Sequence, residues 1–209
     1  MKILEYPMKI VSKISFFLVR VYVTVRYMPR AVFVDKSVQT NKVTSPCIII
    51  ANHTSILDPL LLLTVIKGKK NIVVAKDWYE KKEFHWILSR EKCIPCDRYN
   101  LDTEWIQLAK RDLAEGKSVI IFPEGKTRQD GELNEFKSGF AFLARYTALP
   151  VLSIGIDGIY KLGHRTKYVV GVPEKIERTK GVPSSEDLAN KSEYFRQKVK
   201  SLKEKALEK

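Results

Sequence analysis

Short apolar runs that alternate with helical patterns are the feature of this chain that most restricts its fold. The apolar runs occupy residues 47–51, 71–75, 93–96, 118–122, 151–156 and 168–172. Between them, apolar side chains recur at helical spacing over residues 59–66, 77–88, 103–115 and 136–148. This alternation is typical of a parallel sheet with helices on both faces. We therefore predict an α/β domain, residues 36–209, with a largely parallel central sheet flanked by helices.

Two polar motifs directly follow predicted strands. Asn52 and His53 come after the run at 47–51, and Glu124 and Gly125 come after the run at 118–122. Ligands of such sheets bind beyond the carboxyl ends of the strands. Both motifs are therefore expected to contribute to a functional site at that edge of the sheet.

The first motif offers an imidazole and a carboxylate, His53 and Asp58. On a regular helix their spacing would turn them about 140° from each other, so they would not meet. Asp58-Pro59 instead favours a helix start, because Asp is a good N-cap and Pro suits the first helical position. A turn between strand and helix would bring the pair together, with Asp58 orienting His53 as a general base. The alternative is that Asp58 only caps the helix and His53 only bonds the backbone.

The second motif is a turn rich in groups that bind phosphate. Its glycine, Gly125, permits close approach of the backbone. The Gly-Lys-Thr sequence is not a P-loop, because Ile120 stands where that motif needs its upstream glycine. Arginine binds phosphate with a planar fork and lysine as a point charge. The candidate donors in and near the turn are Arg98, Lys126, Thr127, Arg128 and Lys137. The alternative is a solvated basic loop.

The net charge of +13 restricts the partners of the protein. Such a field attracts anions: nucleic acid, an anionic membrane surface or a phosphorylated substrate. The sequence has no zinc-finger spacing, no RNP-type aromatic signature and no basic zipper. Nucleic acid is therefore not expected as a partner.

Three cysteines are too few for a disulfide framework. Cys93 and Cys96 have the spacing of a redox motif or of half a zinc site, to which His85 could add one ligand. A second cysteine pair is absent from the sequence, so the set stays incomplete and no metal is expected. We interpret the cysteines, Cys47 included, as core or site-lining residues in a reducing compartment. A thiol-redox function is the weaker alternative.

Residues 1–35 combine cations with apolar side chains. Arg20 interrupts the apolar stretch, which disfavours a transmembrane helix, and residues 27–30 make a poor signal-peptide cleavage site. We predict an amphipathic helical segment that anchors the protein on the anionic cytoplasmic face of the cell membrane. The alternative is a helix docked on the protein's own core. The first 30 residues hold one acid, Glu5, and the cations Lys2, Lys9, Lys13, Arg20, Arg26 and Arg30.

The chain from Ser184 onward is rich in Lys and Glu. Apolar residues recur in it at helical spacing, at Leu188, Phe195, Val199, Leu202 and Ala206. This pattern predicts a docking helix with a solvated outer face and no chemical role.

The two motifs, taken with their neighbours, resemble the glycerolipid acyltransferase family, which includes bacterial 1-acyl-sn-glycerol-3-phosphate acyltransferase. Asn52, His53 and Asp58 match the family's Asn-His-x4-Asp motif, and residues 122–125 match the start of Phe-Pro-Glu-Gly-Thr-Arg. Weaker similarity from about residue 46 to 156 includes Lys76, Arg98, Lys137 and Pro150. In one departure, Lys126 stands between Gly125 and Thr127, so either Lys126 or Arg128 is left to take the role of the family's arginine.

The resemblance implies a glycerol-3-phosphate acyltransferase-like fold and an enzyme of phospholipid biosynthesis. Such an enzyme transfers a fatty acyl group from acyl-CoA or acyl carrier protein to the free hydroxyl of lysophosphatidic acid, giving phosphatidic acid. It needs no tightly bound cofactor. The resemblance makes His53 the base, oriented by Asp58, with Asn52, Glu124 and Gly125 shaping the site. The implied phosphate ligands are Lys76, Arg98, Lys126, Thr127, Arg128 and Lys137. The alternatives are another lysolipid as acceptor, or a non-catalytic lipid-binding module.

Overall fold

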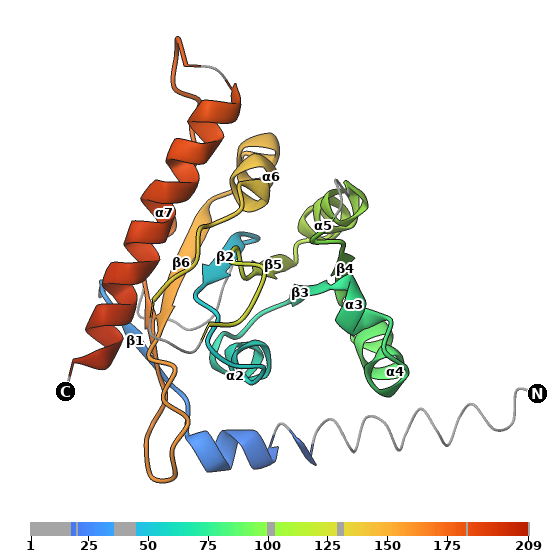
Figure 1. The fold of residues 1–209 in the computed structure, drawn as a ribbon, viewed down its shortest axis with the longest axis vertical. Helices are drawn as coiled ribbons and strands as arrows, with labels where there is room; N and C mark the ends of the chain where they lie inside the picture. Colours follow the sequence, from blue (N-terminus) through green and yellow to red (C-terminus); the bar gives the residue numbers. More distant parts are fainter. Residues whose placement is uncertain are drawn as a thin grey trace, which may run out of the picture.

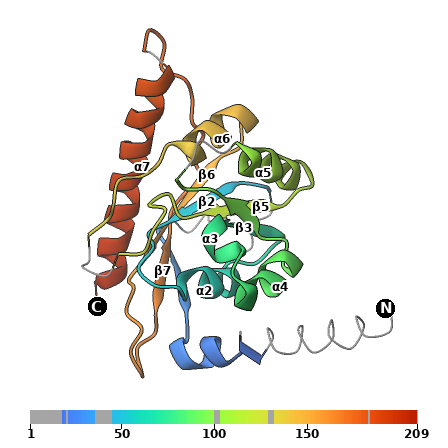
Figure 2. The ribbon, with the colours of Figure 1, turned by 45° about the vertical axis from the view of Figure 1, so that its right-hand side comes forward.

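A seven-stranded sheet forms the centre of the computed structural model, and helices cover both of its faces (Figures 1 and 2). The structure describes residues 18–19, 21–35, 45–99, 103–128, 132–182 and 184–208. The strand order across the sheet is β1-β7-β6-β2-β5-β3-β4. The strands are β1 (Arg30–Phe33), β2 (Ile48–Ala51), β3 (Lys70–Ala75), β4 (Ile94–Cys96), β5 (Ser118–Ile121), β6 (Val151–Ile156) and β7 (Lys167–Val170).

Among these strands, only β6 and β7 pair antiparallel. Residues 157–166 join them as a hairpin, and a hairpin connects antiparallel strands. Strands β7 and β1 therefore run opposite to the other five. The predicted α/β fold, with a mostly parallel central sheet flanked by helices, is confirmed.

The helices divide between the two faces of the sheet. Helices α5, α6 and α7 cover one face, while α2 and a short helix at residues 21–27 cover the other (Figure 1). The labelled helices are α2 (Asp58–Val65), α3 (Lys76–Tyr79), α4 (Lys82–Arg90), α5 (Glu104–Ala114), α6 (Gly139–Thr147) and α7 (Ser184–Leu207).

Strand β2 contributes side chains to the hydrophobic clusters on both faces of the sheet. All four of its residues are buried. Ile48 and Ile50 pack toward α6 in one hydrophobic cluster, whereas Ile49 packs toward α2 in the other. Successive strand side chains point to opposite faces, so an uninterrupted apolar run is what a strand covered on both sides requires.

Two predicted helices differ from the structure: one is interrupted and the other begins later. The other predicted strands and helices of the domain agree with the structure within two residues. Residues 77–88 form two helices, α3 and α4, because Lys81 is extended (φ −62°, ψ 126°) and interrupts the helix. The helix predicted over residues 136–148 begins only at Gly139. There the Lys137 amide donates to the Pro123 carbonyl, 3.0 Å away, and so belongs to the turn after β5.

The N-terminal segment is partly helix and partly strand. In helix 21–27, Val23 is buried, while Val21, Tyr22 and Val25 are exposed. The helix therefore docks on the protein's core and still leaves apolar side chains outside. Residues 30–33, predicted to be helical, instead form β1 at the edge of the sheet. Four of the cations in the predicted anchoring segment, Lys2, Lys9, Lys13 and Arg20, lie outside the described residues.

No helix among the described residues combines the length and the apolar character needed to cross a membrane.

The predicted docking helix is confirmed as α7, which packs along β6 and β7 (Figure 1). Phe195, Val199 and Leu202 are buried on its inner face. The approach to β6 is close enough to require a glycine there. A Cβ added at Gly155 would lie 2.2 Å from the Lys203 amide nitrogen.

We expect Gly155→Ala to lower the free energy of unfolding by about 3 kcal/mol, because the backbone of α7 would have to move away from the strand. Thermal unfolding should show a midpoint lowered by several degrees. The matched control is Ser153→Ala, on the same strand face, where the buried hydroxyl has no hydrogen-bond partner among the described residues. That change should be nearly neutral. Equal midpoints for the two variants would contradict the packing argument.

Candidate active site

His53 and Asp58 meet in the structure. His53 lies in the irregular segment that follows β2, and Asp58 is the first residue of α2. The imidazole Nδ1 lies 3.0 Å from the Asp58 carboxylate Oδ2. The aspartate side chain is fully buried, whereas the histidine side chain is 17% exposed. A buried carboxylate thus holds one nitrogen of an accessible imidazole.

The Asp58 carboxylate is surrounded by donors. Its Oδ2 also accepts the backbone N–H groups of Thr54, at 2.6 Å, and Ser55, at 2.7 Å. Its Oδ1 accepts the hydroxyl of Tyr160. Asp58 is not the helix N-cap that the sequence predicts, since Leu57 holds that position and makes no side-chain cap. The carboxylate instead turns back to the segment before α2, where these amides need an acceptor.

The imidazole of His53 is fixed by stacking as well. Its ring lies 4.3 Å from the Phe122 ring, centroid to centroid, with an interplanar angle of 26°. Since Nδ1 faces Asp58, Nε2 is the nitrogen left to receive a proton from a bound molecule. The arrangement matches a general base with its orienting carboxylate.

Glu124 ties the two motifs together. One carboxylate oxygen accepts the His53 backbone N–H at 2.8 Å, and the other accepts the amide and side chain of Asn134, at 2.8 and 3.0 Å. In return, the Arg128 amide donates to the His53 carbonyl at 2.9 Å. The buried carboxylate therefore positions the turn after β5 beside the segment after β2.

Gly125, in the turn after β5, contacts Arg98, which follows β4. Gly125 has φ +68°, a left-handed conformation that favours glycine. Its carbonyl accepts Arg98 Nη1 at 2.8 Å, and Lys137 Nζ donates to the Arg98 carbonyl, also at 2.8 Å. The structure thus brings together two predicted phosphate ligands, Arg98 and Lys137, beside the predicted site-shaping glycine.

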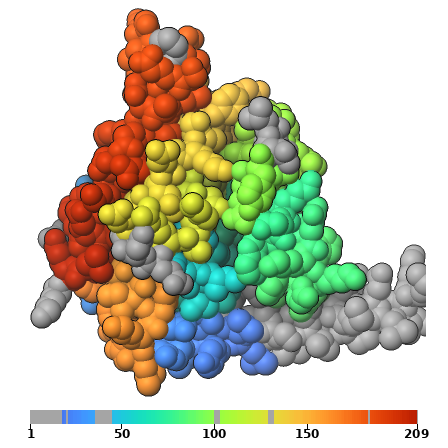
Figure 3. All heavy atoms as spheres, in the orientation of Figure 1, coloured from blue at the N-terminus to red at the C-terminus, as the bar shows by residue number. Residues whose placement is uncertain are grey.

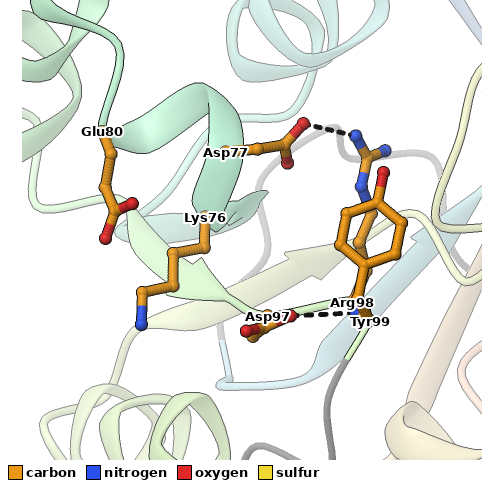
Figure 4. Close-up of a pocket in the computed structure, with 6 residues that line it drawn as sticks. All are labelled: Lys76, Asp77, Glu80, Asp97, Arg98 and Tyr99. Carbon is orange, nitrogen blue, oxygen red and sulfur yellow. Dashed lines mark hydrogen bonds and ion pairs between the residues drawn. The ribbon is translucent and has the colours of Figure 1, made fainter.

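Arg98 also lines a pocket of about 360 Å³ (Figure 4). Its guanidinium Nη2 lies 2.6 Å from Asp77, while its Nε is buried and has no hydrogen-bond partner among the described residues. The pocket holds acids as well as cations, so it is not a uniformly positive site. The lining residues are Lys76, Asp77, Glu80, Asp97, Arg98 and Tyr99.

The remaining predicted phosphate ligands stand apart from this pocket. Lys126 and Thr127 are exposed on the turn. Arg128 directs its guanidinium toward Glu132, at 3.3 Å, and Asn134, at 3.5 Å. Of the six predicted ligands, Lys76 and Arg98 line the pocket and Lys137 contacts Arg98.

Asn52 acts through the backbone of the neighbouring strand. Its side chain accepts the Ile156 amide at 2.7 Å and donates to the Ile156 carbonyl at 3.0 Å. Because Asn52 is buried, it joins the ends of β2 and β6 rather than facing a ligand.

Cys47 and Cys93 are buried in the core, whereas Cys96 directly precedes Asp97 and Arg98 of the pocket. Burial raises the pKa of Cys47 to about 11 and that of Cys93 to about 12, so both thiols stay protonated at neutral pH. Cys96 is half-buried at the end of β4. The described residues contain no group of three or more His, Cys, Asp or Glu that could hold a metal ion.

Sequence reasoning missed Tyr160. It lies 102 residues from Asp58 along the chain, so no local spacing reveals the contact. Burial raises the pKa of its phenol well above the usual range, so the hydroxyl remains a donor. The only available signal is positional, since Tyr160 follows β6 and β6 lies beside β2 in the sheet.

Comparisons with known proteins agree with this geometry. The family model Acyltransferase matches residues 20–157, which include both motifs. A chloroplastic 1-acyl-sn-glycerol-3-phosphate acyltransferase of Brassica napus is 30% identical over 121 residues, 56% of this chain and 35% of the relative. The 1-acyl-sn-glycerol-3-phosphate acyltransferase of Pseudomonas aeruginosa is 30% identical over 145 residues, 68% of this chain and 53% of the relative. The chain therefore spans about a third to a half of these curated relatives.

A solved structure shares the fold. The 1-acyl-sn-glycerophosphate (LPA) acyltransferase PlsC from Thermotoga maritima superimposes with a TM-score of 0.61 at 21% identity, covering 97% of this chain and 84% of that one. The family match covers more than half of the chain and includes the paired His53 and Asp58 and the turn that Glu124 holds beside them. On these grounds the chain belongs to the acyltransferase family.

Proposed function

We propose that this protein transfers a fatty acyl group from an acyl-CoA or acyl carrier protein thioester to the free hydroxyl of lysophosphatidic acid, giving phosphatidic acid. The observation that carries the proposal is the His53 imidazole, paired with the buried Asp58 carboxylate and held beside the basic turn. Relatives named 1-acyl-sn-glycerol-3-phosphate acyltransferases support the choice of acceptor.

His53 would act directly on the acceptor. Its Nε2 takes the hydroxyl proton as the oxygen attacks the thioester carbonyl carbon. A carbon–oxygen bond forms, the carbon–sulfur bond breaks, and the leaving thiolate takes the proton from the imidazolium. Asp58 stabilises the imidazolium during this step, because its carboxylate contacts Nδ1. The attacking group belongs to the substrate, so the enzyme needs no nucleophile of its own.

The substrate phosphate would bind around Arg98. The guanidinium lines the pocket with Lys76, and Lys137 lies against the Arg98 carbonyl. A phosphate that displaced Asp77 from Nη2 would accept hydrogen bonds from the guanidinium. Either Lys126 or Arg128 would complete the site from the turn.

The protein would work at the cytoplasmic face of the cell membrane. Its acceptor has an acyl chain, and helix 21–27 exposes Val21, Tyr22 and Val25 beside the protein core. Such side chains suit the boundary between headgroups and acyl chains, and the net charge of +13 favours anionic lipids.

Replacing His53 tests the chemistry. We expect His53→Ala to reduce the turnover number about 100- to 10,000-fold, because the acceptor hydroxyl loses its base. The measurement is release of free thiol from acyl-CoA, with and without lysophosphatidic acid, repeated with acyl carrier protein as donor. The control is His85→Ala, an exposed imidazole on α4 that lies 3.0 Å from the Tyr79 carbonyl and packs edge-on against the Tyr79 ring.

The outcomes of that assay separate the candidate functions. Wild-type thiol release that depends on the lysolipid and is lost in His53→Ala supports acyl transfer. Release without the lysolipid indicates a thioesterase, with Ser55 as the next residue to replace. A protein that binds lipid equally well with and without His53, and releases no thiol from either donor, is a binding module.

Replacing Arg98 tests the headgroup. We expect Arg98→Ala to raise the KM for lysophosphatidic acid about tenfold to a hundredfold, because charge-assisted hydrogen bonds to phosphate are lost. The KM for the acyl donor should change little. Arg98→Lys should recover part of the affinity, since it restores the charge without the fork. An unchanged acceptor KM in Arg98→Ala would point to a lysolipid with another headgroup.

Replacing Tyr160 tests the positioning of the dyad. Tyr160→Phe keeps the ring and removes one donor to Asp58, so kcat should fall about tenfold while the acceptor KM stays similar. The lost hydrogen bond is one of those that hold the carboxylate against the imidazole, so the loss should appear in kcat and not in the affinity for the acceptor. Tyr27→Phe, whose ring packs edge-on against Tyr160, is the control. A loss of kcat that is matched by a loss of acceptor affinity, or by a lowered midpoint of thermal unfolding, would make Tyr160 merely structural.

A further inference from the structure

The hairpin between β6 and β7 carries an apolar tip that the proposed chemistry does not use. Leu162 is 81% exposed, more than any other large hydrophobic side chain among the described residues. Lys161 and Arg165 stand beside it and are also exposed. Single exposed apolar residues are ordinary on protein surfaces, so the significance of Leu162 depends on how it is presented.

Several hydrogen bonds hold the base of the hairpin in place. The buried Asp157 carboxylate accepts the backbone N–H groups of Ile159 and Lys167, at 3.0 and 2.9 Å, and contacts His164 Nε2 at 2.8 Å. The Thr166 hydroxyl donates to the Ile159 carbonyl at 3.1 Å. This base fixes the direction in which Leu162 projects.

The hairpin is also fastened to helix 21–27. The Thr166 amide donates to the Tyr27 carbonyl at 3.1 Å, and the rings of Tyr27 and Tyr160 pack edge-on at 5.5 Å. Figures 1 and 2 both show the orange hairpin and the blue helix side by side, and Figure 3 shows both at the lower edge of the molecule. The exposed Tyr22 and Val25 therefore belong to the same end of the protein as the tip.

The two segments that form this end carry charge of one sign, and Lys167 also contacts the backbone carbonyl of the acidic residue Glu208. Neither residues 18–34 nor residues 158–172 contain an acid among the positions that the structure describes. A protruding leucine between cations, next to a helix with exposed apolar side chains, suits an anionic lipid surface: the apolar groups enter the acyl boundary and the cations meet headgroup phosphates. The cations of these two stretches are Arg26, Arg30, Lys161, Arg165 and Lys167.

We propose that the hairpin tip, defined by Lys161, Leu162 and Arg165, is a second lipid contact that docks the protein on an anionic bilayer together with helix 21–27. The choice of a bilayer as occupant rests on the proposed function, which takes its acceptor from a membrane. The same hairpin holds Tyr160 on Asp58, so docking at the tip would bring the dyad to the membrane surface.

Vesicle binding of the full chain tests the proposal. Leu162→Asp should weaken partition onto vesicles of phosphatidylcholine mixed with phosphatidylglycerol about tenfold. Replacing Lys161 and Arg165 with Gln should weaken binding to these vesicles several-fold and leave binding to phosphatidylcholine alone nearly unchanged. The matched control is Tyr146→Asp, an exposed residue on α6, which lies at the opposite end in Figure 1. Its partition should equal that of the wild type.

A probe at the tip gives a second readout that does not depend on those variants. An environment-sensitive fluorophore on Leu162→Cys should shift to the blue when the vesicles are added, and one on Tyr146→Cys should not. Cys47 and Cys93 are buried, and labelled wild-type protein gives the background from Cys96.

Two results would overturn the proposal. Unchanged partition of Leu162→Asp, with an unshifted probe at the tip, would leave lipid contact to other parts of the chain. Self-association in the absence of vesicles that Leu162→Asp abolishes would assign the tip to a second copy of the protein. Neither readout requires turnover, so failure of the lipid contact is distinguishable from failure of acyl transfer. Thermal unfolding of each variant verifies that it is folded.

Discussion

The buried carboxylate of Asp58 is the constraint on which the site depends. A buried charge is tolerated only where donors replace the water it has lost. Those donors come from two parts of the chain: the segment after β2 gives the amides of Thr54 and Ser55 and the His53 ring, and the hairpin after β6 gives Tyr160. Satisfying one charge therefore fixes the start of α2, the base of the hairpin and the direction of the imidazole together.

Glu124 plays the corresponding part for the second motif. Its two oxygens accept donors from His53 and from Asn134, so the turn after β5 closes against the segment after β2. The Arg128 amide returns a bond to the His53 carbonyl, and Asn52 locks the same segment to β6. Three neighbouring strands, β6, β2 and β5, thus contribute to one polar network at their carboxyl ends, which is where a parallel sheet places its ligands.

The parts of this structure that local patterns determine were predictable. Strands covered on both faces are mostly apolar, so β2 and β5 stand out in the sequence. Strand β1 does not, because it is a short edge strand with alternating exposure that continues a cationic, apolar segment. Nothing in the composition of residues 77–88 marks Lys81 as the break between α3 and α4.

Within the site, too, contacts between residues close together in the sequence could be predicted, and contacts between distant residues could not. The contact of His53 with Asp58 could be predicted because both lie in one strand-to-helix connection. The contact with Tyr160 could not, because it exists only once β6 has paired with β2. The error over Asp58 as N-cap has the same origin: a capping preference describes an isolated helix end, whereas here the amides of Thr54 and Ser55 take the carboxylate.

The acids around Arg98 do not argue against phosphate binding. The ion pair with Asp77 is partly exposed, with the aspartate side chain 42% accessible, and such pairs contribute only about 0–1 kcal/mol. Hydrogen bonds from a guanidinium to phosphate contribute about 1.5–3 kcal/mol each, so a phosphate can displace Asp77 at small cost. Until then, Asp77 and the Gly125 carbonyl hold the guanidinium in place. The phosphate ligand that we propose would therefore meet an arginine that is already ordered, and less side-chain entropy would be lost on binding.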